Sequence, residues 1–240
     1  MSWEKGELLY EGKAKKIFSV KGESDLIWQD FKDSFTAFNG EKKETMEGKG
    51  KINRQIASIV FQKLANQGIP SHWVADDGEI SMVTKKLTMI DLEVVVRNRL
   101  AGSTAKKFAI KEGTDLDEPL TEFYYKKDEL NDPFISDDQA MMLKVVKQRS
   151  DLDQLKKIAL MVNSVLVKLF SDANISLVDF KIEFGYDNQG EILLGDEISP
   201  DSCRLWDKDT QEKMDKDRFR RELGQVLENY QEVLNRISKQ

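Results

Sequence analysis

The chain is poor in the residue types that define several common kinds of site. Its 240 residues include one cysteine, Cys203, and one histidine, His72. A single cysteine cannot form a disulfide within the chain, which is typical of proteins in a reducing compartment. A single histidine excludes a metal ion held by several imidazoles and any mechanism that needs a pair of histidines.

Long apolar runs and a surplus of positive charge are also lacking. No stretch approaches the roughly 18 apolar residues of a membrane span, and the N-terminal MSWEKGELLYEG has no apolar run of signal-peptide length. The formal net charge is −6, whereas a nucleic-acid binder needs a clustered cationic surface. We therefore expect a cytoplasmic protein that binds neither membranes nor nucleic acids. A small anionic ligand is compatible with these charges, because a few local lysines and arginines can bind it.

Two familiar nucleotide-binding signatures are missing as well. GKGK at residues 48–51 lacks the earlier glycine and the following Ser or Thr of a P-loop, and no G-x-G-x-x-G occurs. If the chain uses ATP, it does so outside those two folds.

The order of the expected elements predicts an α+β fold in two lobes. We place the division near residues 84–90, which gives an N-terminal lobe of residues 1–88 and a C-terminal lobe of residues 89–240. The main expected segments are a strand–turn–strand at 8–20, an exposed loop at 40–51, a helix from Ile52 to Gly68, a turn-rich region at 113–135, a capping box at Ser136, a helix carrying Leu152 to Leu169, a hairpin at 177–198 around DNQG, and a last helix from Asp217 to Ile237.

The expected hairpin and the residues after it are the clearest candidates for chemistry. In LVDFKIEFG alternate side chains share a face, so Asp179, Lys181 and Glu183 lie opposite the apolar residues. The returning strand ends at Asp196, which the hairpin can bring close to Glu183. Two neighbouring carboxylates repel each other unless a cation lies between them, and Mg²⁺ prefers one or two carboxylates with water and phosphate. The alternative is a solvated polar face on which Lys181 forms a salt bridge.

Cationic residues elsewhere predict contacts to phosphate. EGKAKK places Lys13 and Lys15 around a glycine turn whose backbone N–H groups can bind phosphates. In VVVRNRLAGST, Arg97 and Arg99 leave a buried strand on the same side, shortly before Ser103 at an expected helix start, which favours a phosphate monoester. The alternative is that the two arginines pair with Glu93 or other acids.

The remaining distinctive residues favour structural roles. His72 has bulky apolar neighbours and no nearby partner in the sequence. Nothing around Cys203 indicates a reactive thiolate, and the Met141–Met142 pair is typical of core filling.

Six segments, in this order and at these separations, resemble the SAICAR synthetase family, also named phosphoribosylaminoimidazole-succinocarboxamide synthase. The resemblance covers nearly the whole chain and rests on LYEGKAKKIF, FKDSFTAFNG, GKGKINRQI, VVVRNRLAGS, LVDFKIEFG and GDEISPDSCRLWD, followed by DKDRFRR. It implies two lobes with antiparallel sheets flanked by helices and with ATP in the cleft between them. It also implies a ligase of purine biosynthesis. Such an enzyme joins the carboxylate of CAIR, an aminoimidazole ribonucleotide, to the amine of L-aspartate through an acyl phosphate, while ATP becomes ADP and phosphate.

The resemblance further implies roles for individual residues. The ATP contacts are expected at Lys13, Ala14, Lys15, Lys86 and Met89, the last two beside the adenine. Glu183 and Asp196 are expected to hold Mg²⁺. The remaining expected contacts are Arg97, Ser103 and Arg204 for the substrate phosphate or carboxylate, and Lys181 and Asp201 near the reacting groups. Either Asp201 or the released phosphate takes the proton of the amine. Some family members carry an aspartate where this chain has Asn39, which leaves the role of residues 33–41 open.

Two other functions share part of this pattern. A small-molecule kinase would use the same ATP and Mg²⁺ residues without an amine acceptor, and a regulatory module would bind nucleotide without turnover. The last amphipathic helix could be the surface of a homodimer or could pack on its own lobe.

Overall fold

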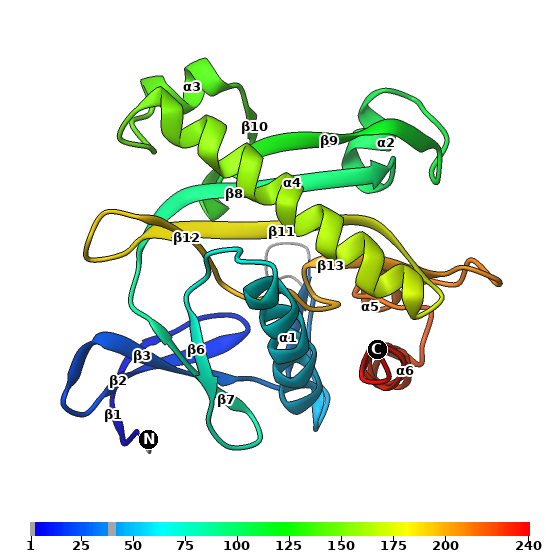
Figure 1. Cartoon of the computed structure of the whole chain (residues 1–240). Helices are drawn as coiled ribbons and strands as arrows, with labels where there is room; N and C mark the ends of the chain where they lie inside the picture. The colour runs from blue at the N-terminus through cyan, green and yellow to red at the C-terminus, as the bar shows by residue number, and fades with distance from the viewer. Residues whose placement is uncertain (1–2, 38–41) are drawn as a thin grey trace.

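The computed structural model describes residues 3–37 and 42–240, which form two larger antiparallel sheets with helices packed against them (Figure 1). In the first sheet the strand order is β1-β2-β3-β7-β6. Its strands are β1 (Lys5–Glu11), β2 (Lys15–Val20), β3 (Glu23–Phe31), β6 (Trp73–Asp76) and β7 (Ser81–Lys85). Separately, β4 (Ser34–Ala37) pairs with β5 (Lys42–Thr45).

The second sheet has the order β10-β9-β8-β11-β12, and β13 also pairs with β11. Its strands are β8 (Thr88–Arg99), β9 (Asp115–Tyr125), β10 (Phe134–Ile135), β11 (Ile175–Tyr186), β12 (Ile192–Gly195) and β13 (Cys203–Asp207). The predicted hairpin is confirmed, because β11 and β12 pair across the DNQG turn with Glu183 opposite Gly195. This pairing brings the end of β12 beside Glu183.

The helices cover these sheets and fill the space between them. They are α1 (Lys49–Asn66), α2 (Gly102–Lys107), the 3-10 helix η2 (Asp128–Leu130), α3 (Asp137–Met142), α4 (Arg149–Asp172), α5 (Asp217–Arg220) and α6 (Val226–Ile237). The long helix α4 lies across the second sheet (Figure 1) and packs on β8 and β11. Its predicted apolar positions from Leu152 to Leu169 are buried, so the periodicity identified the packed face.

Helix α1 connects the two parts of the molecule. Its apolar positions Ile52, Ile56, Val60 and Leu64 are buried, and the helix contacts β3, α4 and α6. It ends as predicted, with Gly68 at a φ of +68°, a backbone conformation that favours glycine. One continuous apolar core therefore includes residues from both sheets.

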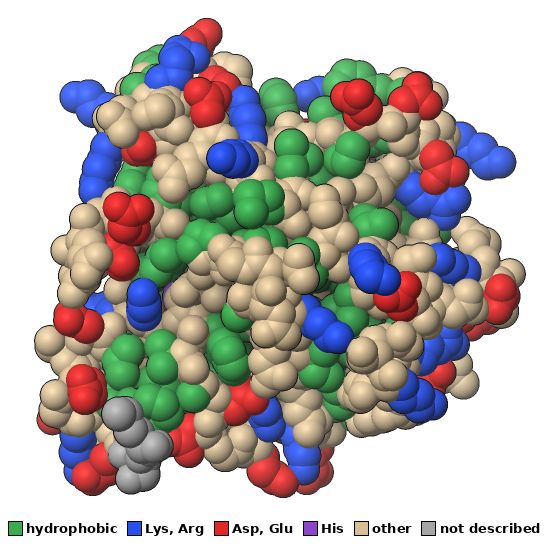
Figure 2. Space-filling model, viewed as in Figure 1, with side chains coloured by type: hydrophobic (Ala, Val, Ile, Leu, Met, Phe, Trp, Pro, Cys, Tyr) green, Lys and Arg blue, Asp and Glu red, His purple; other side chains and the backbone are tan. Residues whose placement is uncertain are grey.

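The mixed surface charge and the helices agree with the expectations from the composition. Figure 2 shows acidic and basic side chains interspersed over the face that it views, without a broad region of one sign. No helix in residues 3–37 and 42–240 is long and apolar enough to cross a membrane.

The segment at 40–51 is exposed over most of β5, as the sequence predicts, but it is not a loop throughout. Its described part contains β5 and the start of α1, and both Lys49 and Gly50 are buried. A Cβ at Gly50 would lie 2.5 Å from the carbonyl oxygen of Phe31. The glycine that indicated a loop therefore permits close packing of the helix start, and the buried Lys49 forms an ion pair with Asp201.

The region at 113–135 is also more regular than its prolines indicated. It contains the eleven-residue strand β9. Pro119 is tolerated because it lies where the pairing with β8 is irregular, between Asp115 and Leu120. On the other side of β9, β10 pairs only with Phe123 and Tyr124, so Pro119 has no ladder hydrogen bond to lose there.

Two helical expectations need correction. The predicted capping box at Ser136 is present, but α3 has six residues. Met142 is 71% exposed, so of the predicted pair only Met141 packs against the core.

The predicted last helix is divided into α5 and α6. Between them Glu222, Gly224 and Gln225 have positive φ values, and Leu223 is exposed. The apolar spacing continued through the break, but the backbone conformation did not.

A substitution at Gly224 tests whether the last helix is divided. Gly224→Ala should lower the free energy of unfolding by about 1 kcal/mol, because alanine is disfavoured at a φ of +68° even where nothing lies within 4 Å of the new Cβ. A continuous helix would instead gain about 0.5–1 kcal/mol from the same change. Urea denaturation measures the sign. Glu228→Ala, at an exposed position inside α6, is the control, with an expected change within about 0.5 kcal/mol.

Candidate functional site

Residues of both sheets line one cavity of about 540 Å³. One end is apolar and is formed by Ile17 and Ile27 of the first sheet with Leu87 and Met89 near the start of β8. The other end is charged. The ionisable residues that line the cavity are Lys13, Lys15, Lys85, Glu93, Lys126, Asp128, Asp132, Lys181, Glu183 and Asp196, and His72 lines it too. An apolar group attached to an anionic one matches this distribution of side chains.

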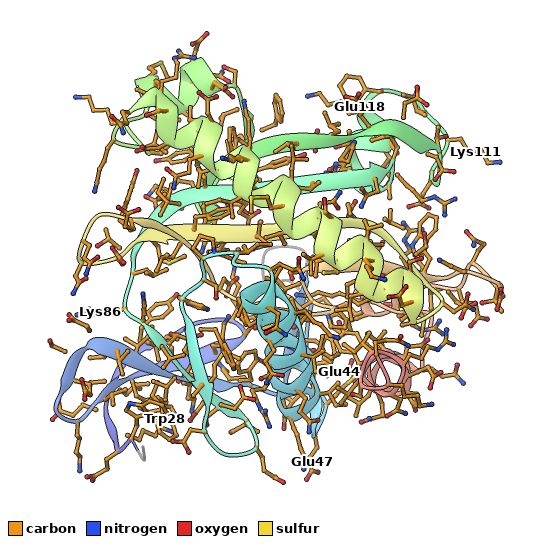
Figure 3. All side chains as sticks on the ribbon, viewed as in Figure 1. Trp28, Glu44, Glu47, Lys86, Lys111 and Glu118 are labelled. Carbon is orange, nitrogen blue, oxygen red and sulfur yellow. The ribbon has the colours of Figure 1, made fainter. Side chains whose placement is uncertain are left out.

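The apolar end depends on two glycines of the hairpin. A Cβ at Gly185 would lie 2.8 Å from the Cβ of Leu87, and one at Gly195 would lie 3.3 Å from Met89 Cε. The glycines therefore let the β7–β8 connection approach β11 and β12. Lys86 lies on this connection (Figure 3), but its exposed side chain does not line the cavity.

At the charged end, Lys15 joins the two sheets. Its buried ammonium forms an ion pair with Asp196 and lies 3.1 Å from Glu197 Oε2. Burial alone would lower the pKa of Lys15, but the two carboxylates outweigh it and raise that pKa. Burial would likewise raise the pKa of Asp196, yet Lys15 and Lys181 hold it well below its usual range. Both groups are therefore charged at neutral pH.

On the face of β11 that the sequence singled out, Asp179 and Glu183 are buried and Lys181 is half-buried. Lys181 Nζ lies 2.7 Å from Glu93 and 2.9 Å from Glu183, and Lys126 also forms an ion pair with Glu183. The predicted salt bridge of Lys181 is thus present. It does not remove the metal hypothesis, because Glu183 and Asp196 line the same cavity. Across the described parts of the chain, three or more potential metal ligands do not converge. The two carboxylates fit a hard cation such as Mg²⁺, which completes its coordination with water and phosphate.

A second cavity, of about 480 Å³, adjoins the first. Glu93, Asp132 and Lys181 line both cavities, so a group bound in one can meet a group bound in the other at this junction. The other polar residues of the second cavity are Arg97, Ser103, Tyr124, Asn131, Asp179, Asp201, Ser202, Arg204 and Arg220.

The arginines of the second cavity are held by buried acids. Arg97 donates to Glu122 and Asp179 at 2.6 Å each, and not to Glu93. Arg204 donates to the same Asp179 at 2.9 Å. Burial disfavours the charge of Arg204, but Asp179 and a second acid raise its pKa. These partners orient both guanidinium groups at the cavity wall, where the side chain of Arg204 is 20% exposed and that of Arg97 only 4%.

The approach of Arg204 to α2 requires a glycine. Gly102 has a φ of +61°, and a Cβ there would lie 2.6 Å from Arg204 Nη2. This close packing keeps Arg204 next to Ser103 at the edge of the second cavity.

Asp201 lines the second cavity but has little basicity. Lys49 forms an ion pair with its carboxylate, and Asn53 Nδ2 and the Tyr230 hydroxyl each donate to it at 2.9 Å. Burial opposes the negative charge, but Lys49 outweighs burial and lowers the pKa of Asp201 to about 2. A carboxylate with three donors and this pKa is a weak proton acceptor at neutral pH.

Several lining residues were missed from the sequence. Lys126 and Asp132 belong to KKDELNDP, a mixed run of cations and acids directly after the apolar end of β9, and that position was the available signal. His72 was given a purely structural role. It is buried and packs on Phe61, and burial with Lys15 nearby lowers its pKa to about 4, yet it also lines the first cavity. Cys203 is buried, and burial raises its pKa, which agrees with an unreactive thiol. Asn39 lies outside the described residues.

Comparisons with known proteins match this chain over almost its full length. The family model described as SAICAR synthetase matches residues 8–237. A phosphoribosylaminoimidazole-succinocarboxamide synthase from Shouchella clausii is 52% identical over 233 residues, which cover 97% of each chain. The crystal structure of the enzyme of that name from Ehrlichia chaffeensis superposes with a TM-score of 0.93 at 42% identity, covering 97% of this chain and 98% of the other. A SAICAR synthetase solved in complex with ADP gives a TM-score of 0.93 at 44% identity and covers 98% of each chain.

The ion pair between the sheets makes a stability prediction. Lys15→Met should lower the free energy of unfolding by about 3 kcal/mol, because it leaves the carboxylates of Asp196 and Glu197 buried without their ammonium group. Lys13→Met is the matched control, since its pair with Asp128 is exposed and should contribute less than about 1 kcal/mol. Denaturant unfolding at pH 7 measures both. Equal losses in the two variants would show that other groups neutralise the buried acids.

Proposed function

The chain belongs to the SAICAR synthetase family, and we propose that its two adjoining cavities are the nucleotide and ribonucleotide sites of that family's reaction. The activity is the ATP-dependent ligation of CAIR and L-aspartate, which gives SAICAR in purine biosynthesis. The observation that carries the assignment of the sites is their common wall. Glu93, Asp132 and Lys181 line both cavities, which is where a phosphoryl group can pass from one substrate to the other.

ATP occupies the first cavity in this proposal. The adenine lies at the apolar end with Met89, and Lys86 borders it through its place in the chain between two lining residues. The phosphates lie against Lys13, Ala14 and Lys15, in the turn between β1 and β2. This turn supplies backbone N–H groups together with two ammonium groups, which suits a polyphosphate.

Glu183 and Asp196 are the proposed ligands of Mg²⁺. The ion, when bound, neutralises phosphate charge and so favours attack on phosphorus. The residues of this chain prepare that position, because Lys15 and Lys181 keep the carboxylate of Asp196 ionised, and Lys126 and Lys181 form ion pairs with Glu183.

CAIR occupies the second cavity. Its phosphate binds Arg97, Arg204 and Ser103, whose guanidinium and hydroxyl groups give bidentate and single hydrogen bonds to phosphate oxygens. With the phosphate held there, the carboxylate at the other end of CAIR can reach the junction at Lys181.

The proposed reaction has two steps at this junction. A carboxylate oxygen of CAIR attacks the γ-phosphorus of ATP, the bond to the β–γ bridging oxygen breaks, and ADP leaves. The amine nitrogen of L-aspartate then attacks the acyl carbon, and the bond from that carbon to the phosphate oxygen breaks. Lys181 neutralises charge that moves between the cavities. The amine proton goes to the departing phosphate, because Asp201 is held by three donors and instead fixes the turn that carries Ser202.

We also propose the wider setting of the enzyme. The N-terminal lobe, predicted as residues 1–88, ends at the connection between β7 and β8, because Thr88 already pairs with Tyr186 in the second sheet and so belongs to the C-terminal lobe. An ATP-consuming step of biosynthesis and a single free cysteine favour the cytoplasm. A homodimer through the apolar face of α6 is not supported, because Tyr230, Val233 and Ile237 are buried within the chain.

Product formation from defined substrates tests the function. ADP and phosphate should accumulate only when ATP, CAIR and L-aspartate are all present, and SAICAR should form in equal amount. Stoichiometric ADP with a stable phosphorylated product in the absence of the amine would indicate a kinase. ATP binding without any product under these conditions would indicate a regulatory module.

Replacing Asp196 tests the metal assignment. Asp196→Asn should lower kcat at least about 100-fold and weaken the Mg²⁺ dependence of ADP binding, because an amide is a poor ligand for Mg²⁺. The fold should persist, since Glu197 still contacts Lys15. Glu191→Gln, an exposed acid just before β12, is the matched control and should leave both quantities unchanged. Steady-state rates and calorimetric ADP titrations with and without Mg²⁺ provide the measurements. An unchanged rate and Mg²⁺ dependence in Asp196→Asn would remove this residue from the metal site.

A further inference from the structure

Three arginines converge on one buried carboxylate, Asp217, beside the second cavity. Arg204 Nε donates to it at 3.1 Å, Arg220 Nη1 at 2.7 Å and Arg221 Nη2 at 3.5 Å. The Asp217 side chain is only 3% exposed. Arg204 and Arg220 line the cavity, whereas Asp217 does not. The carboxylate therefore lies behind two cationic groups that face the cavity.

The position of Asp217 is itself fixed by its neighbours. The buried Asp215 accepts the backbone N–H of Asp217 at 2.7 Å and that of Leu205 in β13 at 2.8 Å. This carboxylate therefore ties the start of α5 to the strand that carries Arg204. On the other side of α5, Phe219 packs on Phe35 with ring centroids 5.2 Å apart. The carboxylate of Asp217 thus has a defined place relative to the cavity.

Hydrogen bonds to one edge of a guanidinium group set the direction of the others, because the group is planar and rigid. Asp217 accepts a hydrogen bond from Nε of Arg204, while Asp179 accepts one from Nη1 of the same guanidinium group. The two acids together fix the plane of Arg204. Asp217 also accepts a hydrogen bond from Nη1 of Arg220, so one carboxylate sets the spacing of two guanidinium groups at the cavity wall.

We propose that Asp217 is a positioning residue for the ribonucleotide: it holds Arg204 and Arg220 at a fixed separation, so that their remaining N–H groups bind the anionic groups of that substrate together. Asp217 itself does not touch the substrate. The proposal rests on the proposed function, since it takes the second cavity as the ribonucleotide site. Its physical basis is pre-organisation, because two long side chains that are ordered in advance lose less conformational entropy on binding.

The test variant is Asp217→Asn. It is nearly isosteric, but its amide group turns a hydrogen-bond donor toward a guanidinium donor and so displaces one arginine. The KM for CAIR should rise at least about 10-fold, since one charge-assisted hydrogen bond is lost. The KM for ATP should stay within about twofold, because Lys13 and Lys15 lie outside this cluster. Glu222→Gln is the matched control: it removes an exposed acid from the same segment, bonded to Lys42 and to none of these arginines, and both KM values should be unchanged.

A double-substitution cycle separates positioning from general stability. If Asp217 acts through Arg204, Asp217→Asn combined with Arg204→Ala should raise the KM for CAIR by less than the product of the two single effects. Multiplicative effects, or an equal rise in both KM values for Asp217→Asn alone, would overturn the proposal. Should the asparagine variant not fold, Asp217→Glu, which keeps the charge on a longer side chain, takes its place in the same cycle with a smaller expected rise. Additive free energies would again reject positioning.

The Arg204→Ala arm distinguishes failure of this inference from failure of the proposed sites. A raised KM for CAIR in Arg204→Ala with an unchanged KM in Asp217→Asn rejects positioning alone. An unchanged KM for CAIR in Arg204→Ala rejects both the assignment of the second cavity and the role of Asp217.

Discussion

The ion pair of Lys15 with Asp196 is the contact on which the rest of the site depends. Lys15 begins β2 in the first sheet, and Asp196 follows β12 in the second. Neither charge would be tolerated alone in this buried region, because removing an ion from water without a partner is very costly. The two sheets can therefore bring these charges inside only by facing each other in this arrangement. That arrangement creates the cavity lined by both sheets, with its apolar end on one side of the pair.

Two lysines of the first cavity each contact two acids. Lys15 contacts Asp196 and Glu197, and Lys181 contacts Glu93 and Glu183. An ammonium group has three N–H donors, so Lys181, which donates to Glu93 and Glu183, retains one donor. Because the acids already fix the ammonium group, that donor is oriented before a ligand arrives. Such fixed donors stabilise developing charge without reorganisation during the reaction. A site built in this way can promote phosphoryl transfer without a nucleophilic side chain.

Local patterns in the sequence predicted the parts of the fold that depend on local rules. The alternation in LVDFKIEFG identified β11, and the spacing of Leu152 to Leu169 identified the buried face of α4. Features that local patterns do not determine could not be predicted from the sequence. Pro119 is compatible with β9 only because of how the adjacent strands end, and the break before α6 depends on backbone angles that apolar spacing does not encode. The site shows the same division. The hairpin brought Glu183 and Asp196 to one cavity as predicted. The ion pair between Asp201 and Lys49 could not be predicted, because the two residues are far apart in the sequence.

In the proposed arrangement, the difference between a kinase and a ligase lies at the junction of the cavities and not in the nucleotide cavity. The first cavity supplies charge neutralisation, which any phosphoryl transfer from ATP needs. Amide formation adds a second requirement, because the acyl phosphate must stay in place until an amine attacks it. A substrate anchored only by its reacting carboxyl group would lose the contacts of that carboxylate when the group becomes an acyl phosphate and then an amide. Arg97 and Arg204 hold the far end of the substrate, where its charge does not change during the reaction. The arginines, and the buried acids that orient them, therefore keep the activated carbon beside Lys181 through both steps.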